Sequence, residues 1–313
     1  MANERPAGTQ PRLELTLGPV LYHWDAARLR TFYRRIADET AIDNVVLGEV
    51  ICPKRSPFAS EALAEAAEYL GRAGKRVIHA SFALISDDRD WRAACALAQA
   101  AEELEINDLA VLAARAGKSF TVGPFLNVYN VDTLAWLKDL GAERICLVPE
   151  LDRDRIAALG SVAGITKEVI VFGRLPLALS ARCYHARSHG LRKDECRFVC
   201  GQDPDGLAVT TLDDQDFVYV NGIATMAAGY VDLTAVVDEL VASGISAFRL
   251  LPQDIDMVAV ADLWRRLLDG VLAPSVARAE LQRIVARVPL TDGFYYGRAG
   301  MRREGDAHDA GPR

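Results

Sequence analysis

The sequence of 313 residues has no long apolar run and only six cysteines. No segment approaches the roughly 18 uninterrupted apolar residues of a transmembrane helix, so none is expected. Residues 1–12, MANERPAGTQPR, are polar and do not resemble a secretory signal. Six cysteines are too sparse for a disulfide scaffold. These absences predict a cytoplasmic protein in which a local group of cysteines binds metal or takes part in catalysis.

Positive charge and aromatic side chains are also in short supply. The net charge is −7 and aromatic residues make up 7% of the chain, which gives little support to a nucleic-acid partner. No glycine-rich dinucleotide or phosphate loop follows the first expected strand. Neither a G-x-S-x-G elbow nor an H-E-x-x-H motif is present, so the sequence does not favour a working peptidase.

Short apolar segments alternate with amphipathic ones along most of the chain. Strands are expected at 13–19, 43–50, 75–84, 108–113, 119–125, 144–150, 168–174, 216–222 and 247–253. Helices are expected at 24–39, 60–74, 87–104, 131–140, 152–159, 232–243 and 255–270. This alternation indicates an α/β protein with a buried parallel sheet. The number of strands favours a (β/α)8 TIM barrel over a doubly wound open sheet.

The composition of the two ends differs from that of the centre. Residues 1–11 and 301–313 are polar and contain glycine or proline, which predicts disorder in both. Between them we expect one barrel-like domain over residues 12–300.

Three cysteines lie in one loop, residues 181–203. They are Cys183, Cys196 and Cys200, one ligand fewer than the usual set of four for a structural zinc or an iron–sulfur cluster. Cys52 follows the second expected strand, and the carboxyl ends of all barrel strands meet at one mouth. We therefore expect Cys52 to be the fourth ligand.

The remaining two cysteines fit the core. Cys95 lies on an apolar helix face and Cys146 in an apolar strand, and cysteine often behaves as a small buried hydrophobic residue. For both we expect a packing role.

The spacing of the four candidate ligands does not decide which metal centre they bind. Structural zinc usually has two close pairs of ligands, and here only Cys196 and Cys200 are close in sequence. An iron–sulfur cluster tolerates more scattered ligands, whereas His185 and His189 could complete a mixed zinc site. Nearby cations that would offset a negatively charged cluster are Arg182, Arg187, Arg192, Lys193 and Arg197. A solvated basic loop that binds nothing is the remaining interpretation.

A resemblance to UbiV-like proteins of the collagenase-like peptidase family extends over about residues 12–300. It is carried by LELTLGPVLYHW, DNVVLGEVICPKRSPF, RCYHARSHGLRKDECRFVC and LTDGFYYGRAG. The resemblance implies a [4Fe–4S] cluster on Cys52, Cys183, Cys196 and Cys200. It also implies a heterodimer with a UbiU-like protein in O2-independent hydroxylation during anaerobic ubiquinone biosynthesis. The oxygen donor implied is a small organic molecule, with prephenate proposed.

Two alternatives remain within this resemblance. The chain could be a non-catalytic scaffold that carries the cluster while the partner holds the substrate. Other relatives hydroxylate bases in RNA, so an RNA-base hydroxylation enzyme is the second alternative.

Polar side chains at the expected strand ends are candidates for substrate contact. They are Glu49, Arg55, His79, Asn127, Glu150, Arg174 and Asn221. The mouth of a barrel holds the chemistry of (β/α)8 enzymes. Arg55 and Arg174 are favoured if the donor is a carboxylate, because a guanidinium binds a carboxylate through two parallel hydrogen bonds.

Each of these candidates also has a structural interpretation. Glu49 could pair with Arg55 or Lys54, and His79 could be a core histidine. Asn127 could cap the helix that begins near residue 130. The two arginines could pair with Glu49 or Glu150 and hold loops in place.

Overall fold

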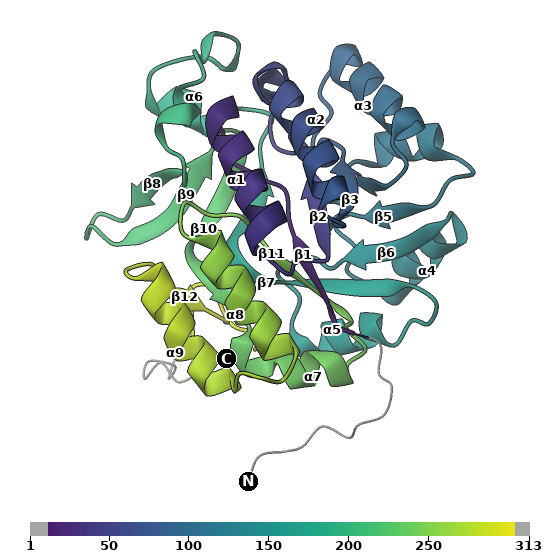
Figure 1. Cartoon of the computed structure of the whole chain (residues 1–313). Helices are drawn as coiled ribbons and strands as arrows, with labels where there is room; N and C mark the ends of the chain where they lie inside the picture. Colours follow the sequence, from purple (N-terminus) through teal and green to yellow (C-terminus); the bar gives the residue numbers. More distant parts are fainter. Residues whose placement is uncertain (1–11, 304–313) are drawn as a thin grey trace.

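Parallel strands close into a barrel in the computed structural model, which describes residues 12–303 (Figure 1). Neighbouring strands pair in the order β1 to β7, and β11 pairs with both β7 and β1, which completes the ring. The barrel strands are β1 (Glu14–Leu17), β2 (Asn44–Leu47), β3 (Arg76–Ala80), β4 (Leu104–Ile106), β5 (Phe120–Val122), β6 (Ala142–Cys146), β7 (Thr166–Leu179) and β11 (Ala247–Leu250). The predicted (β/α)8 barrel is confirmed.

Helices between the strands cover the outside of the barrel. They are α1 (Ala26–Glu39), α2 (Ser56–Arg72), α3 (Asp88–Ala100), α4 (Val131–Asp139), α5 (Arg153–Gly160), α7 (Val237–Ala242), α8 (Met257–Leu268) and α9 (Pro274–Val285). Five of them start at a side-chain cap, in which Asp25, Asp87, Asn130, Asp152 or Asp256 accepts a backbone N–H of the first turn. Within residues 12–303, no helix has both the length and the apolar character that crossing a bilayer requires.

The interior of the barrel contains charged side chains. Arg249 donates to Glu105 and Glu168, both at 2.5 Å, and Arg144 donates to Glu168 at 3.0 Å. Arg144 also donates to Glu14 at 2.8 Å. All of these side chains except Glu14 are almost fully buried, and a buried charge is tolerated when it is paired and hydrogen-bonded.

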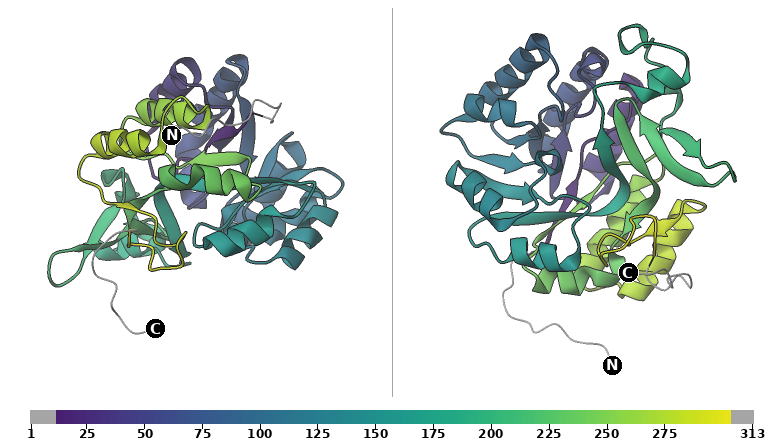
Figure 2. Two further views of the ribbon diagram at one scale, coloured as in Figure 1. Left: turned by 90° about the horizontal axis from the view of Figure 1, so that it is seen from below. Right: turned by 180° about the vertical axis from the view of Figure 1, so that it is seen from behind.

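The second half of β7 leaves the barrel and carries an antiparallel extension of the same sheet. There β7 pairs with β10 (Ala224–Asp232), which pairs with β9 (Asp216–Asn221), and β9 pairs with β8 (Leu207–Thr210). The short β12 (Leu290–Thr291) joins β10. Figure 2 shows this extension at one side of the barrel. The cysteine loop and helix α6 (Tyr184–Ser188) connect β7 to β8.

This antiparallel extension closes part of the barrel mouth. Ile223 and Met226, at the start of β10, share an apolar cluster with Val46 of β2 and Ile78 of β3. Burying these side chains together fixes the cysteine loop against the end of the barrel. The mouth of the barrel is therefore partly filled by apolar residues.

The prediction for residues 104–113 was wrong. Strand β4 covers Leu104–Ile106, whereas the apolar run at 108–113 lies within a 3-10 helix, Leu109–Arg115, whose first turn is capped by Asp108. Glu105 interrupts the apolar pattern of β4 because it points into the barrel toward Arg249. Because the buried pair of Glu105 and Arg249 places a charged residue in the strand, the hydrophobic pattern did not predict β4.

The strand expected at 216–222 is present over Asp216–Asn221, but it is not one of the barrel strands. That segment is β9, which is antiparallel and lies outside the barrel, and β8, β10 and α9 were not expected. The expected disorder of residues 1–11 and 304–313 concerns positions outside the described residues. Residues 301–303 of the expected tail are described, and Arg303 pairs with Asp232 at 3.2 Å.

Candidate metal centre

Four cysteines from two distant segments line one small cavity. Cys52 follows β2 and precedes a 3-10 turn, Pro53–Arg55. Cys183 caps α6, and its Sγ accepts from the backbone N of Ala186 at 3.4 Å. Cys196 and Cys200 lie on the turns that follow. The structure thus brings together all four of the predicted ligands.

The sulfur atoms of the four candidate ligands are not in the arrangement that a single zinc ion would impose. Within residues 12–303, no three cysteine Sγ atoms lie within 4.8 Å of one another. Four thiolates on one zinc would be about 3.8 Å apart, given Zn–S bonds of about 2.3 Å in a tetrahedron. A [4Fe–4S] cluster holds its ligands further apart, because each thiolate binds a different iron. The cysteine sulfurs would have to move closer together to bind one zinc ion, and the mixed zinc site with His185 and His189 stays open.

Burial disfavours ionised thiols in this cavity. It raises the pKa of Cys52 to about 11 and also raises the pKa of Cys200. The nearby Arg55 opposes both shifts. Deprotonated sulfur would therefore be stabilised here by a bond to a metal, with the Arg55 charge offsetting part of the negative charge.

Arg55 is fixed beside the cysteines, at 1% exposure. Its Nη1 donates to the carbonyl of Leu21 at 3.0 Å and its Nη2 to Oδ1 of Asn221 at 2.9 Å. Its Nε has no acceptor within the described part of the chain. Burial alone would lower the pKa of Arg55, but Glu49 and the two cysteines Cys200 and Cys52 raise it. The side chains of Arg55 and Cys200 also interact by a hydrogen bond, so this guanidinium is placed where it would donate to sulfur of a bound cluster.

The turn between β9 and β10 approaches this guanidinium closely. Gly222 has φ +61°, and a Cβ at this position would lie 2.5 Å from Nη2 of Arg55. Only glycine combines that backbone conformation with that contact.

Glu49 shapes the loop that carries Cys52. Its Oε1 accepts from the backbone N of Ile51 at 3.0 Å and of Cys52 at 2.9 Å. It lies 4.0 Å from Arg55, so the expected structural pairing is present. Burial raises the pKa of Glu49, and the two backbone donors and Arg55 oppose that shift.

The turn between Cys196 and Cys200 contains an unusual backbone. Arg197 and Phe198 are consecutive non-glycine residues with φ of 49° and 53°, a conformation that costs free energy unless tertiary contacts impose it. Phe198 packs edge-on against Phe58, with ring centroids 4.5 Å apart, and lies near His23. Sequence reasoning missed this aromatic contact, because nothing in the local pattern around Phe58 or His23 pointed to the cysteine loop.

The guanidinium group of Arg174 bonds to other residues of the chain. At 1% exposure, it donates to the carbonyl of Ala227 at 3.0 Å and to Asp205 at 3.0 Å. Its guanidinium lies 3.5 Å from the ring centroid of Tyr219. The expected pairing with a carboxylate is present, but the partner is Asp205 and not Glu49 or Glu150.

The other candidates lie apart from the cysteines, except Asn221. Asn127 and Glu150 line a cavity of about 320 Å3 between the loops after β5 and β6 and the end of β7. Asn130, and not Asn127, caps α4. His79 alternates along β3 with Ile78 and Ala80, which join the mouth cluster, so its side chain lies on the opposite face, toward the helices.

The two remaining cysteines differ in burial. Cys146 is 1% exposed at the end of β6, as expected for a core residue. Cys95 is only partly buried on α3, so its expected core position holds in part. Neither lines the cysteine cavity.

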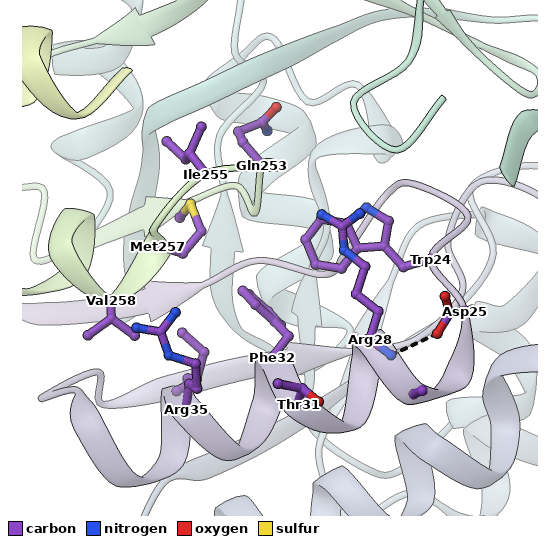
Figure 3. A pocket seen from close by; sticks show the side chains of 12 residues that line it. Trp24, Asp25, Arg28, Thr31, Phe32, Arg35, Gln253, Ile255, Met257 and Val258 are labelled. Carbon is purple, nitrogen blue, oxygen red and sulfur yellow. Dashed lines mark hydrogen bonds between the residues drawn. The ribbon is translucent and has the colours of Figure 1, made fainter. Parts of the chain in front are cut away.

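A further cavity of about 430 Å3 lies between α1 and the segment that joins β11 to α8 (Figure 3). Trp24, Phe32 and Met257 provide its apolar walls. Arg28 lies over the Trp24 ring, 4.1 Å from its centroid. Sequence reasoning did not identify this cavity, because its walls are ordinary helix and loop residues that only the fold brings together.

The sequence model of peptidase family U32 matches residues 24–305. The chain belongs to peptidase family U32. This U32 protein is also similar to solved structures at 10% identity. One is a truncated 3-deoxy-D-arabino-heptulosonate 7-phosphate synthase from Thermotoga maritima, with TM-score 0.43 and coverage of 91% of this chain and 94% of that one.

Two other solved structures are similar at the same 10% identity. The spore coat polysaccharide biosynthesis protein spsE from Bacillus subtilis has a TM-score of 0.41, with 97% and 77% of the two chains covered. A Rubisco-like protein from Rhodopseudomonas palustris has a TM-score of 0.38, with 88% and 65% covered. The barrel of the U32 protein is established by its own strand pairing and not by these similarities.

Proposed function

We propose that this U32 protein is the iron–sulfur subunit of an O2-independent hydroxylation system for ubiquinone biosynthesis. Its cluster would be a [4Fe–4S] centre held by Cys52, Cys183, Cys196 and Cys200. The convergence of these four side chains on one cavity carries the proposal. We further propose that it works in the cytoplasm, in a heterodimer with a UbiU-like protein, with prephenate as a possible oxygen donor.

The residues of the chain have separate roles in this proposal. Glu49 orients the Cys52 loop through two backbone N–H groups. Arg55, held by Leu21 and Asn221, places a fixed positive charge beside the sulfurs. When bound, the cluster would supply one-electron transfer, and a nearby cation favours its reduced, more negative state.

A peptidase activity is not part of the proposal. A cysteine nucleophile acts as a thiolate, and burial raises the pKa of Cys52 to about 11. Such a thiol is protonated at neutral pH in the absence of metal, so it is a poor nucleophile.

Iron and sulfide analysis of anaerobically purified protein tests the cluster. We expect about four irons and four sulfides per chain, as a [4Fe–4S] centre requires, with a matching absorption spectrum. Zinc in place of iron would overturn the cluster. Loss of anaerobic ubiquinone formation in cells that lack the protein, restored by the wild type and not by Cys52→Ala, tests the pathway.

A second candidate is a non-catalytic scaffold that carries the cluster for its partner. It is supported by the positions of Arg55 and Arg174, whose guanidinium groups are buried and bonded within the chain. Calorimetric titration of prephenate separates the two candidates. Binding to the isolated cluster-loaded chain favours a catalytic subunit, whereas binding only to the complex with the partner favours the scaffold.

A further inference from the structure

Two histidines and an aspartate meet at the edge of the cysteine cavity, which His185 also lines. His185 lies in α6 and His189 ends that helix four residues later, with their rings parallel to within 5°. Asp203 ends the turn that contains Cys200, and its Oδ2 lies 2.8 Å from Nε2 of His185. One donor atom from each of the three residues lies within 4.8 Å of the other two.

The orientation of the His185 ring is set by the backbone of β9. Its Nδ1 lies 3.2 Å from the carbonyl oxygen of Val220. A carbonyl oxygen only accepts, so Nδ1 carries the hydrogen. In the neutral ring the lone pair of Nε2 then faces the carboxylate of Asp203, and two acceptors oppose each other at 2.8 Å. A proton on Nε2, or a metal ion bound to both atoms, removes this conflict.

This arrangement is the one that metal-binding histidines commonly show. The ring nitrogen that does not bind metal donates to a carbonyl or carboxylate, which fixes the tautomer and aims the other nitrogen at the ion. Val220 supplies that carbonyl for His185. The contact with Val220 is independent of the proximity of His189 and Asp203, and it leaves Nε2 placed to bind an ion that those two residues also reach.

We propose that His185, His189 and Asp203 bind one divalent transition-metal ion, at a site separate from the four cysteines. Imidazole and carboxylate ligands suit Zn2+ and Fe2+. Three protein ligands leave further coordination positions for water or an oxygen ligand. His185 is fully buried, Asp203 is partly buried and His189 is exposed, so solvent reaches the ion from the His189 side.

The ion would link two segments that carry cluster ligands. Cys183 begins α6, which holds both histidines, and Cys200 lies three residues before Asp203. An ion at this site would therefore fix α6 relative to the turn at residues 199–202. The charge of Arg55, which acts on His185, opposes a cation here, while the carboxylate of Asp203 favours one.

The test uses the cluster-loaded protein, so that the cysteines are occupied by iron. After chelator treatment and anaerobic equilibrium dialysis against Zn2+, bound zinc and iron are measured per chain. We expect one zinc per wild-type chain. His189→Ala and Asp203→Asn should each weaken zinc affinity by about tenfold or more. Loss of a residue that only hydrogen-bonds a metal ligand already costs about tenfold in affinity, and loss of a ligand should cost at least as much.

Asp194→Asn is the matched control, since Asp194 is an exposed carboxylate in the same loop. It should bind zinc as the wild type does. Unchanged iron content in all variants would show that the cluster and the fold are intact. No zinc uptake by the wild type, or equal uptake by wild type and His189→Ala, would overturn the site. Iron content reports on the proposed cluster separately, so the two proposals can fail independently.

Discussion

Nη2 of Arg55 donates to Oδ1 of Asn221 at 2.9 Å, across 166 residues of sequence. Asn221 in turn donates to the carbonyl of Leu21 at 2.7 Å, the same carbonyl that accepts from Nη1 of Arg55. These bonds connect the loops after β1 and β2 with the end of β9. They hold the Cys52 loop in place against the sheet that follows the cysteine loop.

Replacing Asn221 by alanine should loosen that connection. The variant leaves Nη2 of a buried guanidinium without its acceptor, which costs about 1–3 kcal/mol. We expect a lower denaturant midpoint and a lower iron content than in the wild type. Gln99→Ala, which removes an amide at an exposed position of α3, is the control. Wild-type stability and iron content in Asn221→Ala would show that the connection is dispensable.

The role of Cys52, the candidate ligand that is distant in sequence, can be tested by comparison with Cys95, which lies outside the cavity. Cys52→Ala should lose stable cluster binding, because one iron loses its thiolate. Cys95→Ala should keep its iron, since Cys95 lies on α3 and does not line the cavity. Iron per chain after anaerobic desalting is the measurement. Full retention of iron in Cys52→Ala would remove Cys52 from the ligand set.

Arg174 should act mainly through stability. Arg174→Lys keeps the charge but loses the planar group that bonds Ala227 and Asp205 and stacks on Tyr219. We expect unfolding free energy to fall by about 1–3 kcal/mol, and ubiquinone formation to fall only as far as folded protein does. Arg153→Lys is the control, because the side chain of Arg153 is 60% exposed.

The opposite result would support direct contact between Arg174 and the proposed oxygen donor. In that case Arg174→Lys would keep wild-type stability, iron content and partner association and still lose anaerobic ubiquinone formation.

The charged interior of the barrel predicts a loss of stability in acid. Burial alone would raise the pKa of Glu168, but Arg144 and Arg249 lower it from the ordinary value of 4.5 to about 2. Because the folded-state pKa is the lower one, this stabilisation is complete above about pH 4.5 and is lost as pH falls toward 2. Its size is about 3 kcal/mol, because the pKa falls from 4.5 to about 2 and each pKa unit corresponds to about 1.4 kcal/mol.

Denaturant unfolding between pH 6 and about pH 3 measures this effect. Glu168→Gln should be less stable at pH 6 and should show a shallower fall toward acid. Glu143→Gln changes an exposed carboxylate on β6 and should follow the wild type. Parallel pH profiles for the wild type and Glu168→Gln would contradict the assigned ionisation.

Oxygen sensitivity should depend on the partner. Cys196 is less buried than the other three candidate ligands, so a cluster would be open to O2 on that side. A partner that covers this side should slow the decay of the cluster absorbance in air. Equal decay rates for the isolated chain and the complex would mean that this chain alone shields the cluster.

The sequence alone was enough to predict the barrel and the set of candidate ligands. Seven of the strands that close the barrel follow the expected alternation of apolar and amphipathic segments, and β4 is the exception. Local hydrophobic pattern records burial on the faces of each strand, so it predicts these elements well. Cys52 could be added to the loop cysteines because parallel strands in a closed barrel end at one mouth.

Only the tertiary structure decided how the charged residues are used. Glu105, Arg174 and Arg55 look like surface or substrate-binding residues in the sequence, yet each is about 1% exposed. Their partners, Arg249, Asp205 and Asn221, lie 144, 31 and 166 residues away. A local pattern contains no information about such pairs, since a buried charge is stabilised by a specific distant partner that only the folded chain supplies.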